Sequence, residues 1–146
     1  MQDKTKLYQV LYVSQITQTT DLIVDLDQIQ QKSFINNKKV NITGILICLE
    51  DTFVQILEGK KKEVLTLMKT ISSDRRHYNL NIIQQGCINN RCWGHWNMGV
   101  LNLSIRKKLL DIGFENSELL INRINKESSI MFLLKRLSEN KSLLIK

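Results

Sequence analysis

The stretch FVQILEG, residues 53–59, decides the fold that we expect for this chain of 146 residues. Its β-branched and aromatic side chains predict a buried strand that ends at Gly59. Gln55 lies in the middle of this apolar run. A primary amide without partners in an apolar setting costs about 1–3 kcal/mol by mutational measurements. The sequence therefore predicts a dedicated hydrogen-bonding partner for Gln55.

The rest of residues 6–100 divides into further strands and two helices. Apolar residues recur at helical spacing over residues 20–37 and again over residues 60–73. Strands are expected at residues 6–14, 42–49, 53–58, 81–87 and 92–100, with SDRRHYN (73–79) interrupting the pattern. The order strand, helix, strand, strand, helix, strand, strand is typical of a ferredoxin-like α+β sheet with one extra strand and both helices on one face.

Two helices on one face of such a sheet leave the other face bare. Residues 104–112 and 117–137 have the apolar spacing of helices and could cover that face. We therefore expect a sheet domain over residues 1–102 and a C-terminal helical cap over residues 103–146.

The composition limits the classes of partner and compartment. The net charge of +7 comes from residues 61–146, where 15 Lys or Arg face 7 Asp or Glu; residues 1–60 hold 6 against 7. The basic clusters Lys60–Lys62 and Arg106–Lys108 are short and lack interleaved aromatic residues, which favours a solvated basic surface over nucleic-acid binding. With three cysteines, no secretory leader and no apolar run of ~20 residues, the chain is expected in the cytoplasm and not in a membrane.

Other motifs have structural interpretations that we favour. Cys87, Cys92 and His95, together with Cys48, have a metal-like spacing, but one cysteine lies inside a predicted strand and the short paired loops of zinc sites are missing. A hydrolytic triad would need a nucleophile elbow, and a nucleotide fold would need a glycine-rich phosphate loop; the sequence has neither. The sequence thus predicts free thiols and no metal.

Several polar residues converge if the predicted topology is correct. Tyr12 lies in the first strand and Gln55 in the third, and these strands are neighbours in a split β-α-β sheet. The first helix ends with Ser33, Asn36 and Asn37 on the side that its apolar residues bury earlier. Such a polar cluster between two helices needs a polar occupant. A flat heterocycle with carbonyl and N–H edges would fit.

An ordered set of motifs extends from residue 6 to residue 100. They are Tyr12-Val13-Ser14, Ser33 with Asn36-Asn37, Ile42-Thr43-Gly44, FVQILEG (53–59), Asp74-Arg75-Arg76-His77, and Arg91 followed by Trp93, Trp96 and Met98. In this order and spacing the set resembles the BLUF family of blue-light sensors that use FAD, and the chain resembles its short stand-alone members.

The resemblance implies a role for each residue of the set. FAD would lie between the first two helices, held by Ser33, Asn36, Asn37, Gln55, Asp74, Arg76 and His77. Tyr12 would give an electron and then a proton to the excited flavin, and Gln55 would relay between the phenol and the ring. The amide would be left rotated or tautomerised with a new hydrogen bond to a flavin carbonyl, and the spectrum would shift to the red. Trp96 and Met98 would carry the change to the cap.

The output that the resemblance implies is signalling without enzymatic turnover, through a partner protein or a homo-oligomer. One departure is Trp93, which stands where the family usually has phenylalanine and could compete as an electron donor. Two other interpretations stay open: a flavin-dependent or metabolite-binding enzyme on the same fold, and a basic nucleic-acid-binding module. A yellow purified protein would exclude the module, and a reversible red shift under blue light would exclude the enzyme.

Overall fold

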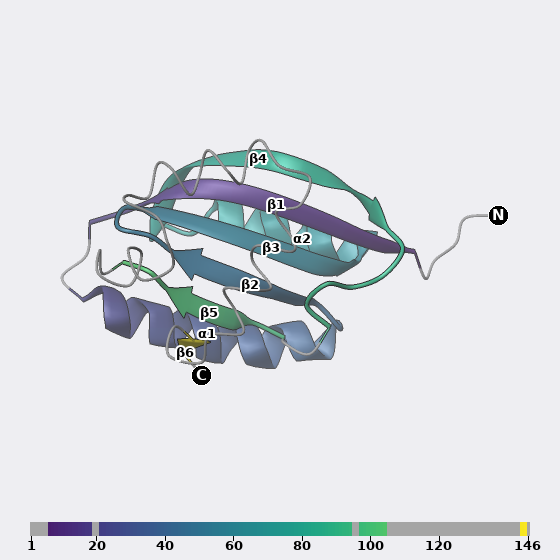
Figure 1. Cartoon of the computed structure of the whole chain (residues 1–146), viewed down its shortest axis with the longest axis horizontal. Helices are drawn as coiled ribbons and strands as arrows, with labels where there is room; N and C mark the ends of the chain where they lie inside the picture. Colours follow the sequence, from purple (N-terminus) through teal and green to yellow (C-terminus); the bar gives the residue numbers. More distant parts are fainter. Residues whose placement is uncertain (1–5, 19–20, 95–96, 105–143, 146) are drawn as a thin grey trace.

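The computed structural model describes residues 6–18, 21–94, 97–104 and 144–145 of the chain. These residues form a mixed sheet with two helices packed on one face (Figure 1). The helices are α1 (Leu22–Lys39) and α2 (Lys61–Ser72), and the strands are β1 (Leu7–Ile16), β2 (Thr43–Cys48), β3 (Thr52–Lys60), β4 (His77–Ile88), β5 (Gly99–Asn102) and β6 (Leu144–Ile145).

The strand order is β4-β1-β3-β2-β5-β6. The part β4-β1-β3-β2 is antiparallel throughout, which confirms the predicted ferredoxin-like arrangement. Strand β5 extends it by pairing in parallel with β2, and β6 pairs antiparallel with β5. The sequence analysis did not predict β6. Because β1 and β3 are both interior strands, their side chains lie at the middle of the sheet.

The helices pack on the sheet through the apolar faces that the sequence predicts. Asp21 caps α1, and its carboxylate accepts a hydrogen bond from the Val24 amide at 3.1 Å. The inward-facing residues of both helices and the sheet form one core cluster, whose helical members include Leu26 of α1 with Val64 and Met68 of α2. Burial of such side chains contributes about 1.5–3 kcal/mol each. The core therefore fixes both helices on the same face.

The opposite face of the sheet is buried as well. Its apolar members with little or no exposed surface are Leu11, Ile45, Ile47, Val54, Ile56, Leu101 and Leu103. The sequence analysis expected a helical cap over residues 103–146 on this face, and nearly all of that segment lies outside the described residues. The cap and the domain boundary at residue 102 stay predictions.

Two strand boundaries differ from the prediction. Strand β4 already begins at His77, because His77 and Tyr78 pair with the end of β1, and Asn79 takes a positive φ of 53° where the register shifts. The polar segment 73–79 was expected to lie outside any strand. Strand β5 begins only at Gly99, so the strand predicted over residues 92–100 is wrong for its first part. There the backbone amides of Cys92 and Trp93 donate to the side-chain carboxylate of Glu58 on β3.

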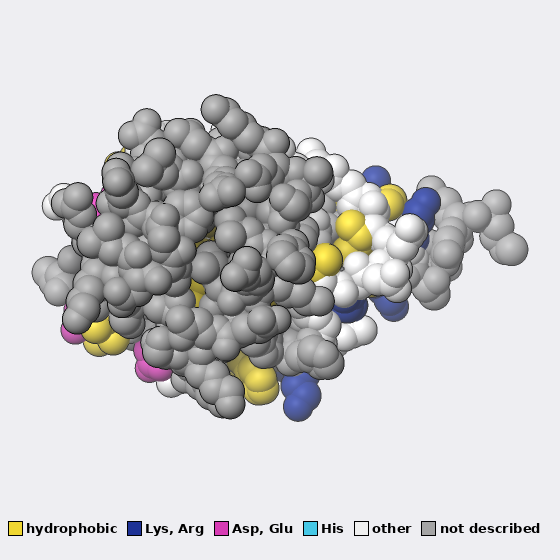
Figure 2. Space-filling view, in the orientation of Figure 1, with side chains coloured by type: hydrophobic (Ala, Val, Ile, Leu, Met, Phe, Trp, Pro, Cys, Tyr) yellow, Lys and Arg dark blue, Asp and Glu magenta, His cyan; other side chains and the backbone are white. Residues whose placement is uncertain are grey.

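On the face of the molecule that Figure 2 shows, acidic and basic side chains lie toward opposite ends of the long axis. In Figure 2, Asp and Glu side chains lie toward the end where α1 begins, and Lys and Arg side chains toward the end where β1 begins. Helix α1 follows the same direction, with Asp25 in its first turn and Lys38 and Lys39 in its last. This orientation complements the helix dipole. No helix among the described ranges is long and apolar enough to span a membrane.

We predict that Gly44→Ala lowers the free energy of unfolding by at least about 2 kcal/mol, because overpacking of a tight site has this cost. A Cβ at Gly44 would lie 2.0 Å from the carbonyl oxygen of Ile56 on β3, so the two strands would have to separate. Urea denaturation measures the change. Gly94→Ala is the matched control, since its Cβ would meet nothing closer than 3.7 Å. Equal stability of the two variants would contradict the close approach of β2 and β3.

Candidate functional site

A cavity of about 130 Å³ lies between α1, α2 and the helix-facing side of the sheet. All of the predicted cofactor-binding residues and both predicted photochemical residues line it: Tyr12, Ser33, Asn36, Asn37, Gln55, Asp74, Arg76 and His77. Met98 lines it too. The topology predicted that Tyr12, Gln55 and the end of the first helix meet, and the segment Asp74–His77, which the resemblance implied, joins them.

The sheet side of the cavity holds a hydrogen-bonded phenol and amide. Tyr12 of β1 and Gln55 of β3 are paired residues in the antiparallel ladder, so their side chains emerge side by side on the same face. The Tyr12 hydroxyl donates to Gln55 Oε1, and Gln55 Nε2 lies 3.4 Å from the thioether sulfur of Met98. Both Tyr12 and Gln55 are buried. The buried amide thus has a partner on its oxygen and another on its nitrogen.

The environment keeps the Tyr12 phenol protonated. Burial raises the pKa of Tyr12 far above its ordinary value, and the negative charge of Asp74 raises it further. A neutral phenol retains its hydroxyl proton and can donate it to the Gln55 oxygen. The site therefore holds a proton donor and its acceptor in contact.

An ion pair lies at the rim of the cavity, where the chain passes from α2 to β4. The Arg76 guanidinium forms a salt bridge with the Asp74 carboxylate. Arg76 donates through Nη2 to Asp74 Oδ2 at 2.5 Å and through Nε to Oδ1 at 3.0 Å. The hydrogen bonds from Arg76 lower the pKa of Asp74, and those to Asp74 raise the pKa of Arg76, so both groups are charged. The adjacent Arg75 is exposed and does not line the cavity.

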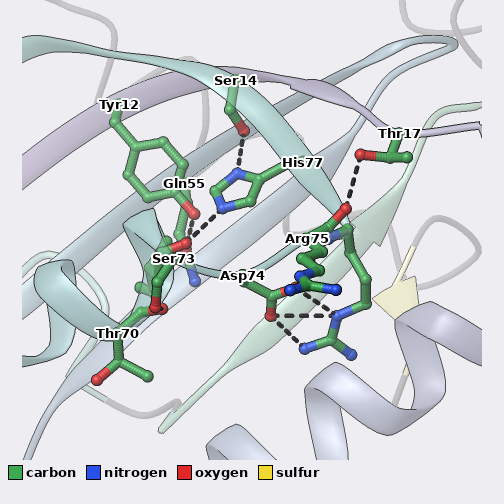
Figure 3. A network of polar contacts seen from close by, with 11 residues as sticks. Tyr12, Ser14, Thr17, Gln55, Thr70, Ser73, Asp74, Arg75 and His77 are labelled. Carbon is green, nitrogen blue, oxygen red and sulfur yellow. Dashed lines mark hydrogen bonds and ion pairs between the residues drawn. The ribbon is translucent and has the colours of Figure 1, made fainter.

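His77 is fixed by hydrogen bonds on both sides of its ring (Figure 3). Its Nε2 lies 2.6 Å from the carbonyl oxygen of Ile71, which can only accept, so Nε2 carries a proton. Its Nδ1 lies 2.7 Å from Ser14 Oγ. The ring centroid is 6.1 Å from that of Tyr12. Because both nitrogens have protein partners, His77 presents the surface of its ring to the cavity.

The opposite wall comes from the last turns of α1. Asn37 is buried and donates from Nδ2 to the carbonyl oxygen of Asn97 at 2.8 Å, whereas Ser33 is half-buried and Asn36 exposed. Asn97 in turn donates to the carbonyl oxygen of Ile42 at 3.1 Å. Helix α1 is thereby tied to the segment that precedes β5.

Some lining residues were missed by the sequence analysis. Lys32 adds a second cation at the rim, and its distance of four residues from Asn36 places both on one face of α1. Phe53 precedes Gln55 by two residues and therefore shares its face of β3. Both periodicities are visible in the sequence, although nothing in the sequence marks Lys32 as part of a site. The apolar lining is completed by Ile29, Leu46, Leu67 and Ile71.

Other predicted residues lie elsewhere or outside the described residues. Trp96 lies outside them, so its part in signal relay is untested, whereas Met98 contacts Gln55. Trp93 is buried, and its backbone amide binds Glu58. Cys48 is buried and Cys87 exposed, and burial raises the pKa of Cys48 to about 12. Among residues 6–18, 21–94, 97–104 and 144–145, no three metal-ligating side chains are grouped.

The donor set of the cavity suits a flat heterocycle with polar edges. Aliphatic side chains from both helices and the aromatic ring of Phe53 can cover ring faces, while hydroxyl, amide and guanidinium groups can meet carbonyl and N–H edges. The fold and site thus define a domain with a cavity between two helices that suits a planar ligand, next to a buried phenol–amide pair.

Comparison with known proteins identifies the family. The model of the BLUF family, described as "Sensors of blue-light using FAD", matches residues 7–99. This chain belongs to the BLUF family and is a blue-light flavin sensor. The family match confirms the resemblance inferred from the motifs.

Relatives of two kinds resemble the chain. The dark-state structure of the BLUF protein BlrB matches this chain with a TM-score of 0.75 and 26% sequence identity. The match covers 92% of this chain and 96% of BlrB. The photo-activated state of BlsA matches with a TM-score of 0.72 and 29% sequence identity, and the match covers 90% of this chain and 94% of BlsA. A photoactivated adenylate cyclase subunit alpha from Euglena gracilis is 35% identical over 89 residues, which are 61% of this chain and 9% of that protein. The chain thus spans about a tenth of such cyclase relatives.

The raised pKa of Tyr12 predicts a stability that falls at alkaline pH. The unfolded phenol loses its proton above about pH 10 while the folded one keeps it, so the unfolding free energy should drop by up to about 1.4 kcal/mol per pH unit from this group. Urea unfolding of the wild type and Tyr12→Phe at pH 8 and pH 11 measures the difference. The variant should lack this component. A difference between the two proteins that is independent of pH would show that Tyr12 ionises normally.

Proposed function

We propose that this chain binds FAD in the cavity between α1 and α2, and that blue light rearranges the hydrogen bonds of Tyr12 and Gln55. The single observation that supports this most is the contact of the Tyr12 hydroxyl with Gln55 Oε1 at the sheet side of that cavity. A phenol held against a movable amide is an arrangement that can switch between two hydrogen-bond patterns.

Different lining residues would contact different parts of FAD. Asn37, supported by Ser33 and Asn36, would meet the polar edge of the ring from α1, and the Phe53 side chain would cover part of the ring system. Arg76 offers a fork of N–H donors to a carbonyl or phosphate oxygen, and Asp74 fixes its direction. Together they orient the ring and exclude water from it.

When bound, FAD absorbs the blue light and accepts one electron. Tyr12 is the side chain placed to supply that electron, and its hydroxyl proton then passes along the existing hydrogen bond toward Gln55 Oε1. When the electron and proton return, Gln55 is left rotated or tautomerised. In the rotated form, the Gln55 nitrogen would lie toward Tyr12 and its oxygen away from it. The contact of Nε2 with Met98 would then be lost.

The output that we propose is protein signalling without enzymatic turnover. BlrB and BlsA have chains of similar extent to this one. In the cyclase subunit, by contrast, the matching part is 9% of the protein, so the domain occurs in larger proteins with their own activity. We place the chain in the cytoplasm, acting on a partner protein or through a homo-oligomer, with Met98 as the first element to move.

We predict that Tyr12→Phe abolishes the light-induced red shift while flavin remains bound, because the substitution removes the hydroxyl proton and the oxidisable phenol. Absorption spectra before and after blue light measure the shift, and mass spectrometry of the released flavin identifies FAD. Tyr78→Phe is the matched control, since Tyr78 lies on β4 and is 54% exposed. A red shift that survives in Tyr12→Phe would contradict the assignment.

We also predict that Arg76→Ala weakens flavin binding by about 10- to 100-fold, the equivalent of one lost charge-assisted hydrogen bond. Fluorescence titration of the protein with FAD measures the dissociation constant. Arg75→Ala removes the same charge one residue away, outside the cavity, and should bind FAD as the wild type does. If both variants lost FAD affinity equally, Arg76 would act only through its positive charge and not through a specific contact with FAD.

A further inference from the structure

Glu58 is a carboxylate with no exposed surface, on the face of β3 opposite the cavity. It follows Gln55 by three residues, so the alternation of side chains along a strand places the two on opposite faces. A buried carboxylate is tolerated only when several donors satisfy it. Nothing in the proposed photochemistry uses Glu58.

The donors to Glu58 come mainly from one segment of the chain. The Trp93 amide donates to Oε1 at 2.7 Å, and the Cys92 amide donates to Oε2 at 2.8 Å. Gln9 on β1 donates from Nε2 to Oε2 at 2.9 Å. Two successive backbone amides are thus held by one side chain, and we refer to this contact as the Glu58 clamp.

Arg91 braces the same end of this segment. Its guanidinium donates to Thr43 Oγ1 at 2.7 Å, to the Glu58 carbonyl oxygen at 3.1 Å and to the Asn41 carbonyl oxygen at 2.7 Å. These acceptors lie on or next to β2 and β3, so residues 91–93 are attached to the sheet itself.

The other end of the segment returns to β3 on the cavity side. There the Met98 sulfur lies 3.4 Å from Gln55 Nε2, and Asn97 is bound to Asn37 and Ile42. Strand β3 is paired on both sides, which fixes Gln55 relative to Glu58. Residues 92 and 93 are therefore attached to β3 through Glu58 on one face, and Met98 contacts the same strand through Gln55 on the other face.

We propose that Glu58 is a positioning residue of the light response: its clamp on residues 92 and 93 sets the place of Met98 against the Gln55 amide. This inference rests on the proposed Tyr12–Gln55 switch. With Met98 in place, its sulfur accepts from Gln55 Nε2 only in the dark arrangement. When the clamp is lost, that arrangement loses stability relative to the rotated one, so the return to the dark state slows.

The test measures the rate of dark recovery after a blue-light pulse in flavin-loaded protein. Glu58→Leu removes the acceptors at similar volume and should slow recovery by roughly fivefold or more, the lower range of coupling between sites. Glu58→Gln keeps an oxygen for the amides of residues 92 and 93, and Gln9 can turn its own amide to match, so this variant should recover nearly as the wild type does. Ile47→Val is the control for altered core packing on the same face.

A double-mutant cycle with Met98→Ala separates positioning from general loss of stability. If Glu58 acts through Met98, Glu58→Leu changes the recovery rate of the Met98→Ala protein by much less than that of the wild type. Additive effects, or wild-type recovery in Glu58→Leu, would overturn the proposal. If Glu58→Leu does not fold, Arg91→Ala decides in its place: it must slow recovery, and only when Met98 is present. A wild-type protein without any red shift would instead refute the proposed function.

Discussion

The antiparallel register of β1 and β3 is the constraint on which the site depends. It pairs Tyr12 with Gln55 and carries Ser14, Val10 and Leu57 on the same face. A slip of one residue would move either side chain to the other face of the sheet and end the contact. The register is held by core packing on both faces, because β3 is buried along nearly its whole length. The geometry of the Tyr12–Gln55 pair therefore depends on the packing of the hydrophobic core.

Strand β3 buries the polar side chains of Gln55 and Glu58 and satisfies them in different ways. Gln55 is neutral and meets side-chain partners, the Tyr12 hydroxyl and the Met98 sulfur, which permit more than one arrangement. Glu58 accepts from two backbone amides, whose positions follow from the course of the chain. An amide can exchange donor and acceptor by turning, whereas a carboxylate with backbone donors has one good arrangement. The same strand thus provides a movable contact and a fixed one.

Much of the core and the site could be predicted because each depends on short-range periodicity. Leu22, Leu26 and Ile29 indicate the inner face of α1, and extending that face by helical spacing gives Ser33 and Asn37 in the cavity. Strand β5 could not be placed in this way. The apolar residues around Trp93 are typical of a strand, but the amides there bind Glu58, 35 residues earlier in the sequence. A contact between a side chain and a distant backbone amide produces no periodic pattern in the sequence. No pattern marks Lys32 as part of the cavity either.

The buried thiol of Cys48 bears on the choice of electron donor. Cys48 belongs to the same core cluster as Tyr12, and a thiolate near an excited flavin would be a competing reductant and nucleophile. Because burial raises the pKa of Cys48 to about 12, the thiol keeps its proton at neutral pH. Burial thus keeps the Cys48 thiol protonated, so that under the proposed photochemistry this sulfur would not compete with the Tyr12 phenol.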